Sequence, residues 1–443
     1  MNRDSKTPVI IVGGGWAGLA TGVELLRNNV QVQIIESAKQ LGGRARCVPF
    51  GNLRVDNGQH LLLGAYHETL RILKTCGVNV ERNFLRMPLH LSVLDKSGDS
   101  FNMKNGNLLA PLNLLQAIAT IPECTLREKL GTLSLLTRLW LTGFSLQRDI
   151  TVKELLRNQP EKLVRMFWEP ICIAALNTHI DTASASLFLN VLRDGFTKKA
   201  SDSDMMIPAV DLAELYVHPA MQYIDQRGGN ISFGKKVTRL VNNDSGFSVI
   251  DAEGDIHTAE HVVVAGSVSS TARLLDNSDL LEQTRSNLDS IEYEPICTIY
   301  LQYPDDIHLP VAMTGLTGYT AQWLFDRHHC GQPGLIAAVI SADGPHMRLD
   351  RITLAQLVSD ELSEIFGWPE ASEYLVVREK RATFRASVDI DQLRPSNQTD
   401  IRRLWLAGDY TAGPYPATLE AAVHSGVQCA QQILQSLQHN GQT

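Results

Sequence analysis

Three glycines near the amino terminus are the residues whose spacing points most directly to chemistry. Gly13, Gly15 and Gly18 form the pattern G-x-G-x-x-G within the stretch VIIVGGGWAGLA. The β-branched run at 9–12 predicts a buried parallel strand, and the pattern at 19–26 predicts a helix. A glycine turn between strand and helix lets the backbone approach a diphosphate, which the free N–H groups at the helix start can bind. The spacing therefore predicts a dinucleotide site.

A second strand, expected at 30–35, ends at Glu36, eighteen residues after Gly18. A carboxylate at this point can accept hydrogen bonds from a ribose. The segment LGGRAR follows, in which Gly43 and its neighbouring glycine return the chain over the diphosphate and Arg44 adds a positive charge. This second element favours FAD, held permanently, over an exchanging NAD. The alternative for Arg44 is a solvated loop arginine.

Further segments of this nucleotide-binding type occur later in the chain. HVVVAG, at 261–266, predicts a buried strand that rejoins the parallel sheet, and the alternation at 247–256 predicts a small antiparallel hairpin. LWLAGDY, at 404–410, predicts a strand and a loop before a long closing helix. Pro414 and Pro416 keep the intervening chain out of a helix, so we expect the closing helix to begin near Thr418.

These repeated segments predict an α/β protein in which a discontinuous cofactor domain is interwoven with a second domain. We expect the FAD-binding domain to comprise 1–78, 205–285 and 395–443. The substrate-binding domain would then comprise 79–204 and 286–394. The first of these two insertions is leucine-rich and is expected to be helical with few strands, whereas the second mixes strands with a helix. At 443 residues the chain exceeds the size of a single hydrophobic core, which agrees with two domains.

Composition excludes several classes of function. A net charge of −8 gives no electrostatic reason to expect nucleic acid as a partner. The seven cysteines lie far apart, without a C-x-x-C pair or zinc spacing, so we expect neither disulfides nor a metal site. MNRDSKTP has no signal-peptide character, and no run of about 18 residues is apolar enough to span a bilayer. We therefore expect a cytoplasmic protein.

Taken together, the motifs resemble those of a known superfamily. The chain is similar to the amine oxidase and phytoene desaturase flavoproteins in five features. They are GGGWAGLA, Glu36, LGGRAR, the central hairpin with Val237, and LWLAGDY followed by a helix. Within that superfamily, the chain resembles the squalene-associated FAD-dependent desaturase family. The segments that carry this resemblance are VDNGQHLLLGAY, FWEPICIAALNT and AGDYTAGPYPATLEAAVHSG. The resemblance implies a Rossmann-like, GR2-type FAD-binding domain beside an α+β substrate domain. It also implies hydroxysqualene dehydroxylation, which uses reduced FAD to make squalene for hopanoid and other triterpene synthesis.

Two other functions remain open on this evidence. One is an FAD-dependent desaturase or oxidase that acts on an isoprenoid or an amine. The other is a flavoprotein-like fold that only carries prenyl groups, as in the dissociation inhibitors of small GTPases. The intact GGGWAG loop and Arg44 count against the second of these, because a prenyl carrier does not need a diphosphate site.

The resemblance also implies roles for residues along the whole cofactor. Those expected to line the diphosphate are Gly13, Gly15, Trp16, Ala17 and Gly18. Glu36 would hold the adenosine ribose, and Gly43 with Arg44 would approach the phosphates or the ribityl chain. Val237 is expected at the adenine edge, and Gly408 and Asp409 at the ribityl chain. Thr418 and Leu419 are expected at the flavin ring. The alternative for Val237 is a plain core residue of its strand. The closing helix would point its positive end at the flavin and favour the anionic reduced ring.

Removal of an allylic hydroxyl requires a proton donor, because hydroxide is a poor leaving group. The candidates, in order, are His60, Glu169 and Asp56. His60 and Asp56 belong to VDNGQH, which by resemblance passes near the flavin ring, and Glu169 belongs to FWEP. A buried carboxyl with a raised pKa could donate the proton, as could an imidazolium. The alternative is that the acids flanking Gly58 only fix the loop.

The segment 108–144 bears on the substrate. Its leucines, isoleucines and single tryptophan recur at helical spacing, with Arg127, Lys129 and Arg138 on the polar side. It is either a pair of ordinary core helices or the mouth of an apolar tunnel resting on a membrane. A long apolar isoprenoid has a negligible concentration in water, so it must pass from lipid into the protein. We therefore expect peripheral attachment to the inner face of the cytoplasmic membrane, with an electron donor that the sequence leaves unknown.

Overall fold

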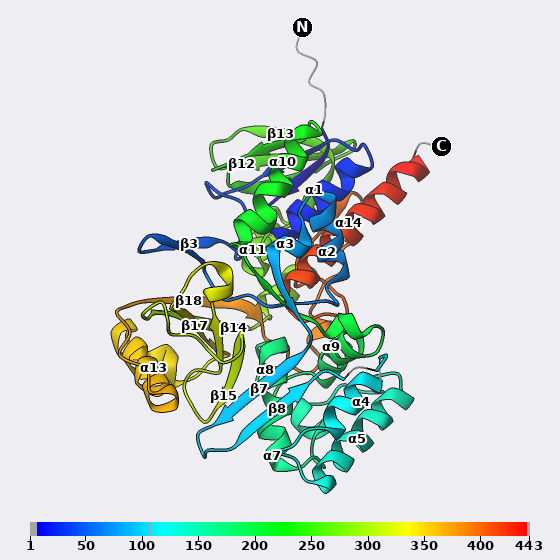
Figure 1. Cartoon of the computed structure of the whole chain (residues 1–443). Helices are drawn as coiled ribbons and strands as arrows, with labels where there is room; N and C mark the ends of the chain where they lie inside the picture. Colours follow the sequence, from blue (N-terminus) through cyan, green and yellow to red (C-terminus); the bar gives the residue numbers. More distant parts are fainter. Residues whose placement is uncertain (1–6, 107, 111, 441–443) are drawn as a thin grey trace.

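The chain folds around two seven-stranded sheets, one at each end of the molecule (Figure 1). The computed structural model describes residues 7–106, 108–110 and 112–440, so the first six residues of MNRDSKTP lie outside it. The parallel strands of the first sheet are, in order, β10 (Asn230–Ser232), β2 (Val32–Ile35), β1 (Thr7–Val12), β13 (Ile256–Val264) and β19 (Leu404–Leu406). The predicted return of the 261–266 strand to the parallel sheet is confirmed.

An antiparallel extension continues the first sheet. The first half of β13 pairs with β12 (Gly246–Asp251), and β12 pairs with β11 (Val237–Asn243). Thus the predicted hairpin exists as β12 with the first half of β13, and β11 adds a third antiparallel strand at the edge of the sheet. Phe247 and Val249 point into a core cluster shared with the parallel strands, which explains the alternation seen in the sequence.

Helices α1 (Trp16–Arg27) and α14 (Leu419–Asn440) lie side by side against the first sheet (Figure 1). Their contact is close because Gly426 of α14 faces the backbone of α1. A Cβ added at Gly426 would lie only 2.3 Å from the carbonyl oxygen of Ala17. The closing helix begins where the sequence predicts, since the Thr418 hydroxyl accepts the backbone N–H of Ala421 at 3.1 Å and caps it.

The second sheet contains strands that the sequence analysis did not expect. Its order is β18 (Glu373–Phe384), β14 (Tyr293–Gln302), β17 (Leu335–Ser341), β16 (Trp323–Asp326), β15 (Met313–Thr317), β7 (His90–Asp95) and β8 (Ser100–Lys104). The strands β7 and β8, with the nearby β6 (Phe84–Met87), fall in the insertion expected to be helical, so that expectation was wrong for 84–104. They are short, and β7 completes its pairing with β15, more than two hundred residues away.

The rest of that insertion is helical, as expected. It includes α4 (Leu112–Ala119), α5 (Leu126–Leu141), α8 (Glu169–Leu176) and α9 (Ala185–Phe196). Helix α13 (Arg351–Phe366) packs on the second sheet, away from these helices (Figure 1). Among the described residues, no helix is long and apolar enough to cross a membrane.

Candidate cofactor and active site

The glycine loop lies between β1 and α1, and two of its glycines are required by the packing of the chain itself. Gly13 has φ of +114°, and a Cβ added there would lie 2.7 Å from the carbonyl oxygen of Ala265. A Cβ added at Gly18 would lie 2.0 Å from the carbonyl oxygen of Gly13. Any side chain at either position would therefore collide with backbone, whether or not a ligand is bound.

Gly15 differs, because no contact within the protein requires a glycine there. Its backbone is extended, with φ of −75° and ψ of −177°, a conformation that any residue adopts. The nearest atom to an added Cβ is the Cα of Gly43, at 4.0 Å. The open space beside Gly15 also adjoins the start of α1, whose N-cap offers no side-chain hydrogen bond and whose first turn has no acid. These features fit a bound diphosphate, which needs both close approach and free N–H groups.

The carboxylate of Glu36 is held at the edge of this loop. One oxygen accepts the backbone N–H of Gly14 at 2.7 Å, and the other accepts that of Ala38 at 2.7 Å. Ionised carboxylate oxygens keep further lone pairs after such bonds, so Glu36 can still accept a hydroxyl hydrogen bond from a ribose. Just beyond the adjacent strand β10, the N–H of Lys235 bonds the carbonyl of Glu36 at 2.9 Å. Val237 follows two residues after this hydrogen bond.

Val237 itself begins β11 and pairs with Asp251. Its half-buried side chain packs against the hydrophobic cluster of the first sheet. This packing is what the alternative interpretation, a plain core residue, requires. A backbone contact to an adenine is equally open to it, because the ladder shifts register between Val237 and Arg239.

The LGGRAR segment returns over the glycine loop. The N–H of Gly42 donates to the carbonyl of Gly14 at 2.9 Å, and Gly42 forms a parallel bridge with Gly15. Gly43 lies next to Gly15, since a Cβ added at Gly43 would be 3.3 Å from the Cα of Gly15. The segment thus packs on the glycine loop, and its next residue, Arg44, reaches Asp409.

Arg44 and Asp409 form an ion pair inside a cleft between the two sheets. The guanidinium of Arg44 lies 2.6 Å from Oδ1 of Asp409 and also donates to the carbonyl of Ala382 at 2.8 Å. The carboxylate of Asp409 raises the pKa of Arg44. The side chain of Arg44 is 38% accessible and lines a cleft beside Asp409. The ion pair and the hydrogen bond hold Arg44 in one position, which a freely solvated loop arginine would lack.

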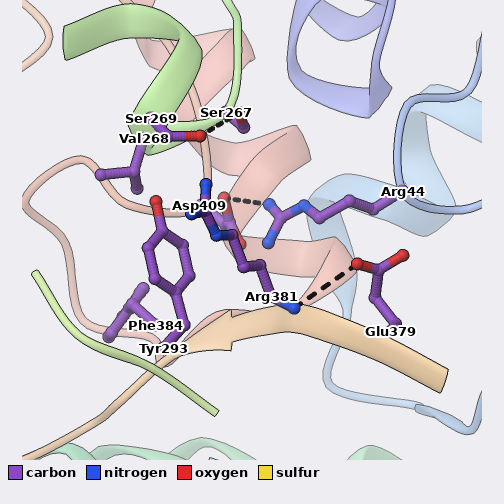
Figure 2. Close-up of a pocket in the computed structure, with 9 residues that line it drawn as sticks. All are labelled: Arg44, Ser267, Val268, Ser269, Tyr293, Glu379, Arg381, Phe384 and Asp409. Carbon is purple, nitrogen blue, oxygen red and sulfur yellow. Dashed lines mark hydrogen bonds and ion pairs between the residues drawn. The ribbon is translucent and has the colours of Figure 1, made fainter. Parts of the chain in front are cut away.

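The cleft has a volume of about 190 Å³ (Figure 2). Its lining residues are Arg44, Ser267, Val268, Ser269, Tyr293, Glu379, Arg381, Phe384 and Asp409. Sequence analysis found Arg44 and Asp409 but missed the others, which come from the start of α11 (Val268–Asn277), from β14 and from β18. Arg381 lies over the ring of Tyr293, with its guanidinium carbon 5.3 Å from the ring centroid. A second guanidinium therefore shares the cleft with Arg44.

Gly408 and Asp409 follow β19 directly. The N–H of Gly408 donates to the hydroxyl of Ser425 on α14 at 3.0 Å, which ties this turn to the closing helix. Asp409 is buried, and its charge is met by Arg44. The acid after the strand therefore has the polar partner that its burial demands.

The loop DNGQH, residues 56–60, connects the cofactor loops to the second sheet. Asn57 donates from its amide to the carbonyl of Arg44 at 2.6 Å and accepts the N–H of Arg46 at 3.2 Å. Gln59 accepts a hydrogen bond from Arg327, a buried arginine that follows β16, at 3.0 Å. The loop therefore fixes the backbone that carries Arg44, which supports the alternative that part of VDNGQH serves to hold the loop.

Asp56 and His60 occupy this loop with opposite pKa shifts. Asp56 accepts the N–H of Leu212 at 2.9 Å, and burial raises its pKa to about 7. Burial lowers the pKa of His60 to about 4, and its Nδ1 is buried without a hydrogen-bond partner in the described structure. The positive charge of Arg327 lowers the pKa of His60 further, and at Asp56 it partly opposes the rise that burial causes. His60 is therefore neutral at pH 7, and it can donate only from a neutral ring N–H.

Glu169 lies at the start of α8 and interacts with a different group of residues. Burial raises the pKa of Glu169, while His179 and Lys153 lower it and Asp181 raises it. The structure thus brings Asp56 and His60 together beside Arg327 but gives Glu169 other neighbours. No cluster of histidine, cysteine and acidic side chains suited to a metal occurs in residues 7–106, 108–110 and 112–440.

The start of α14 is anchored by a carboxylate from its own first turn. Glu420 is buried and accepts the N–H groups of Glu68 at 3.0 Å and Thr69 at 2.9 Å, at the start of α2 (His67–Thr75). Replacing Glu420 with alanine should lower the free energy of unfolding by about 1–3 kcal/mol, because two buried N–H groups lose their acceptor. Urea unfolding measures the change. The exposed Glu364→Ala variant is the control, and equal effects of the two would contradict this capping role.

Comparison with known proteins identifies the family of this chain. The family described as flavin containing amine oxidoreductase matches residues 16–434. Hydroxysqualene dehydroxylase of Rhodopseudomonas palustris is 28% identical over 97% of this chain and 99% of its own length. The enzyme of the same name from Zymomonas mobilis is 26% identical, covering 95% of this chain and 97% of its own. The zeta-carotene desaturase of Arabidopsis thaliana is 24% identical over 97% of this chain and 86% of its own.

Solved structures show the same fold. Cyclohexylamine oxidase from Brevibacterium oxydans superposes with a TM-score of 0.73 at 14% identity, covering 98% of this chain and 100% of that chain. An oxidoreductase from Methanosarcina mazei superposes with a TM-score of 0.72 at 14% identity, covering 96% of this chain and 100% of that chain. The family match spans nearly the whole chain and includes Gly18, the Arg44–Asp409 cleft and most of the closing helix. The chain belongs to the flavin-containing amine oxidoreductases and is an FAD-dependent oxidoreductase.

Proposed function

We propose that this enzyme uses reduced FAD to remove the hydroxyl group of hydroxysqualene, forming squalene. The observation that carries the proposal is similarity over nearly the full length to three hydroxysqualene dehydroxylases, at 24–28% identity. A second candidate is an isoprenoid desaturase, which the similarity to zeta-carotene desaturases favours. Both candidates have long apolar isoprenoid substrates, and they differ in the direction of electron flow.

In this proposal the cofactor contacts run from the glycine loop past the Arg44–Asp409 cleft to the start of α14. Gly13, Gly15, Trp16, Ala17 and Gly18 would hold the diphosphate, with Glu36 at the ribose and the backbone of Val237 at the adenine. Gly43, Arg44, Gly408 and Asp409 would hold the phosphates and the ribityl chain, with Thr418 and Leu419 at the flavin ring. The glycine at position 15, which no contact within the protein requires, and the start of α1, which has no side-chain cap, support this placement.

The reaction replaces a hydroxyl group with hydrogen. The allylic C–O bond breaks, the hydroxyl leaves as water after taking up a proton, and a C–H bond forms at the same carbon. When bound, reduced FAD supplies the hydride and is oxidised by two electrons. The protein must supply or relay the proton and keep the developing allylic cation away from water.

Asp56 and His60 are the proposed proton-handling residues beside the flavin, with Glu169 as a third candidate. The raised pKa of Asp56 means that part of its population is protonated near neutral pH, which suits an acid. The lowered pKa of His60 means that it would hydrogen-bond the leaving hydroxyl as a neutral ring. The unpartnered, buried Nδ1 of His60 supports a role toward a ligand.

His60→Ala should retain its FAD and lose turnover by at least about 100-fold, because a positioned proton donor contributes that much. FAD absorbance and squalene formation measure the two effects separately. The wild-type pH profile should show no step near pH 6.5 from His60, since its pKa lies near 4. The exposed His308→Ala is the control. Full turnover in the His60 variant would remove this residue from the mechanism.

The proposed domain limits are those of the sequence: an FAD-binding domain of 1–78, 205–285 and 395–443 and a substrate-binding domain of the remainder. The strands of each seven-stranded sheet fall within one of these sets, which supports the division. We also place the enzyme at a membrane surface on the cytoplasmic side. A thirty-carbon hydrocarbon would gain up to about 24 kcal/mol on leaving water, so lipid is where it resides.

A product assay under argon tests the proposal. Enzyme reduced with dithionite and mixed with hydroxysqualene in detergent should form squalene, and the same enzyme left oxidised should not. When squalene itself is added to the oxidised enzyme, it should remain unchanged. New double bonds formed from an isoprenoid by the oxidised enzyme, without squalene formation by the reduced one, would favour the desaturase.

A further inference from the structure

Helix α5 carries two apolar faces, and only one of them packs into the protein. Successive residues of an α-helix are rotated by about 100°, so residues of one face recur at fixed spacing. The buried residues Thr132, Leu135, Leu136 and Leu139 share one arc of α5. On the other side, more than half the surface of each of four large apolar residues is exposed: Leu126, Leu130, Trp140 and Leu141. By the same rotation these four fall within an arc of about 100°.

The exposed face of α5 continues into a larger apolar surface. Twelve large hydrophobic residues of the described chain are exposed, and seven of them lie between 108 and 141. The three outside α5 are Leu108, Leu109 and Leu112, at or just before the start of α4. Helix α4 packs on α5, at the end of the molecule away from the first sheet (Figure 1). We call these seven residues the α4–α5 surface. Concentrated exposed apolar residues mark an interaction site.

Basic side chains flank this surface although the whole protein is acidic. Arg127 and Arg138 lie about 100–120° from Leu126 around the helix, beside the exposed apolar arc, and Lys129 lies near its other edge. None of these three cations forms an ion pair within the part of the chain that the structure describes. The acid of this turn, Glu128, is engaged by Thr125 in a capping box. With a net charge of −8, the chain has here a local excess of positive charge.

We propose that the α4–α5 surface rests on an anionic lipid bilayer, with α5 lying in the plane of the interface. An apolar face of leucine and tryptophan bordered by arginine and lysine is what binds a helix to such an interface without crossing it. The 16 residues of α5 do not span a membrane. The proposal rests on the proposed function for its purpose, the transfer of a lipid-dissolved substrate. Its physical basis is the surface itself.

Sedimentation with vesicles tests the apolar part of the surface. The FAD-loaded enzyme should bind vesicles of phosphatidylcholine with phosphatidylglycerol. The variant Leu126→Gln/Leu130→Gln/Leu141→Gln should bind at least about tenfold more weakly, because the residues that enter the lipid are gone. The matched control Phe233→Gln/Ile256→Gln/Ile352→Gln changes three apolar residues that are exposed elsewhere and should bind like wild type.

A second arm tests the charge. Arg127→Gln/Arg138→Gln should bind vesicles of phosphatidylcholine alone as wild type does and lose the additional affinity for phosphatidylglycerol. Arg273→Gln/Arg351→Gln, which removes two exposed arginines elsewhere, should keep it. Wild-type binding that is unaffected by either α5 variant would overturn the proposal. So would a wild type that ignores vesicles but forms a dimer that the leucine variant dissociates.

Turnover assays distinguish a failure of the docking surface from a failure of the proposed function. With hydroxysqualene in detergent, the leucine variant should match wild type, and with hydroxysqualene supplied in vesicles it should be slower. An enzyme that binds vesicles through α5 but forms no squalene in either assay would keep the docking surface and refute the dehydroxylation. Equal rates of the variant and wild type on vesicle-borne substrate would count against the docking surface alone.

Discussion

Replacing Gly15 with valine should give a folded protein that carries no FAD. The extended backbone at this position accepts a β-branched residue, and the nearest protein atom to an added Cβ is 4.0 Å away. A β-carbon at this position therefore meets only an ordinary van der Waals contact within the protein. A diphosphate bound at the start of α1 would not tolerate the valine side chain, because the methyl groups would enter the space that the phosphates need. FAD content after purification, read from flavin absorbance, should fall by at least about 100-fold, the loss of roughly 3 kcal/mol of binding.

The control for this variant is Gly131→Ala. Gly131 lies within α5, where an added Cβ would have only ordinary contacts, the nearest at 3.6 Å. That variant should remain yellow. Gly15→Val should also keep the circular dichroism spectrum of the wild-type apoprotein. A Gly15→Val protein with a full complement of FAD would show that the diphosphate lies elsewhere.

Replacing Asp56 with asparagine should change how stability depends on pH. Burial raises the pKa of Asp56 from an ordinary 3.8 to about 7, so between these values the folded protein binds more protons than the unfolded chain. Stability contributed by this group is therefore present at low pH and is lost as pH rises toward 7, by up to about 1.4 kcal/mol per pH unit. Asparagine has no such titration and can still accept the N–H of Leu212. The variant should gain stability relative to wild type between pH 5 and pH 8.

Denaturant unfolding of both holoproteins at pH 5, 6.5 and 8 measures this difference. The lowered pKa of His60 gives wild type a slope of the opposite sign between about 4 and 6.5, but it is present in both proteins and cancels in the comparison. Asp400→Asn, at an exposed carboxylate, should show no such trend. A stability difference between Asp56→Asn and wild type that is constant with pH would mean that Asp56 is ionised throughout this range.

Much of the cofactor end could be predicted because its signals are local. The strand β1, the glycine loop and α1 are consecutive in the chain, and each has its own pattern of apolar residues and glycines. The same holds for β13 and for the closing segment from β19 to α14. In these segments, burial on both faces gives continuous apolar runs, and the prolines at 414 and 416 mark where the helix cannot yet begin.

The parts that were missed depend on contacts between distant segments. Strand β7 pairs with its neighbour β8 in a hairpin, and only its other edge, which pairs with β15, depends on a distant segment. Arg381 and Tyr293 reach the cleft only because the second sheet packs beside Arg44, which bonds a carbonyl 338 residues away. Glu169 was grouped with His60 and Asp56 by motif, but its electrostatic neighbours are Lys153, His179 and Asp181. Proximity of this kind has no local signal in the sequence.

The stoichiometry of one turnover tests the account most directly. Enzyme whose FAD has been fully reduced under argon, with excess reductant removed, is mixed with one equivalent of hydroxysqualene in detergent. We predict that flavin absorbance returns as squalene forms, with one squalene for each flavin reoxidised. Flavin that stays reduced while the substrate is untouched, or that reoxidises without squalene, would contradict the account.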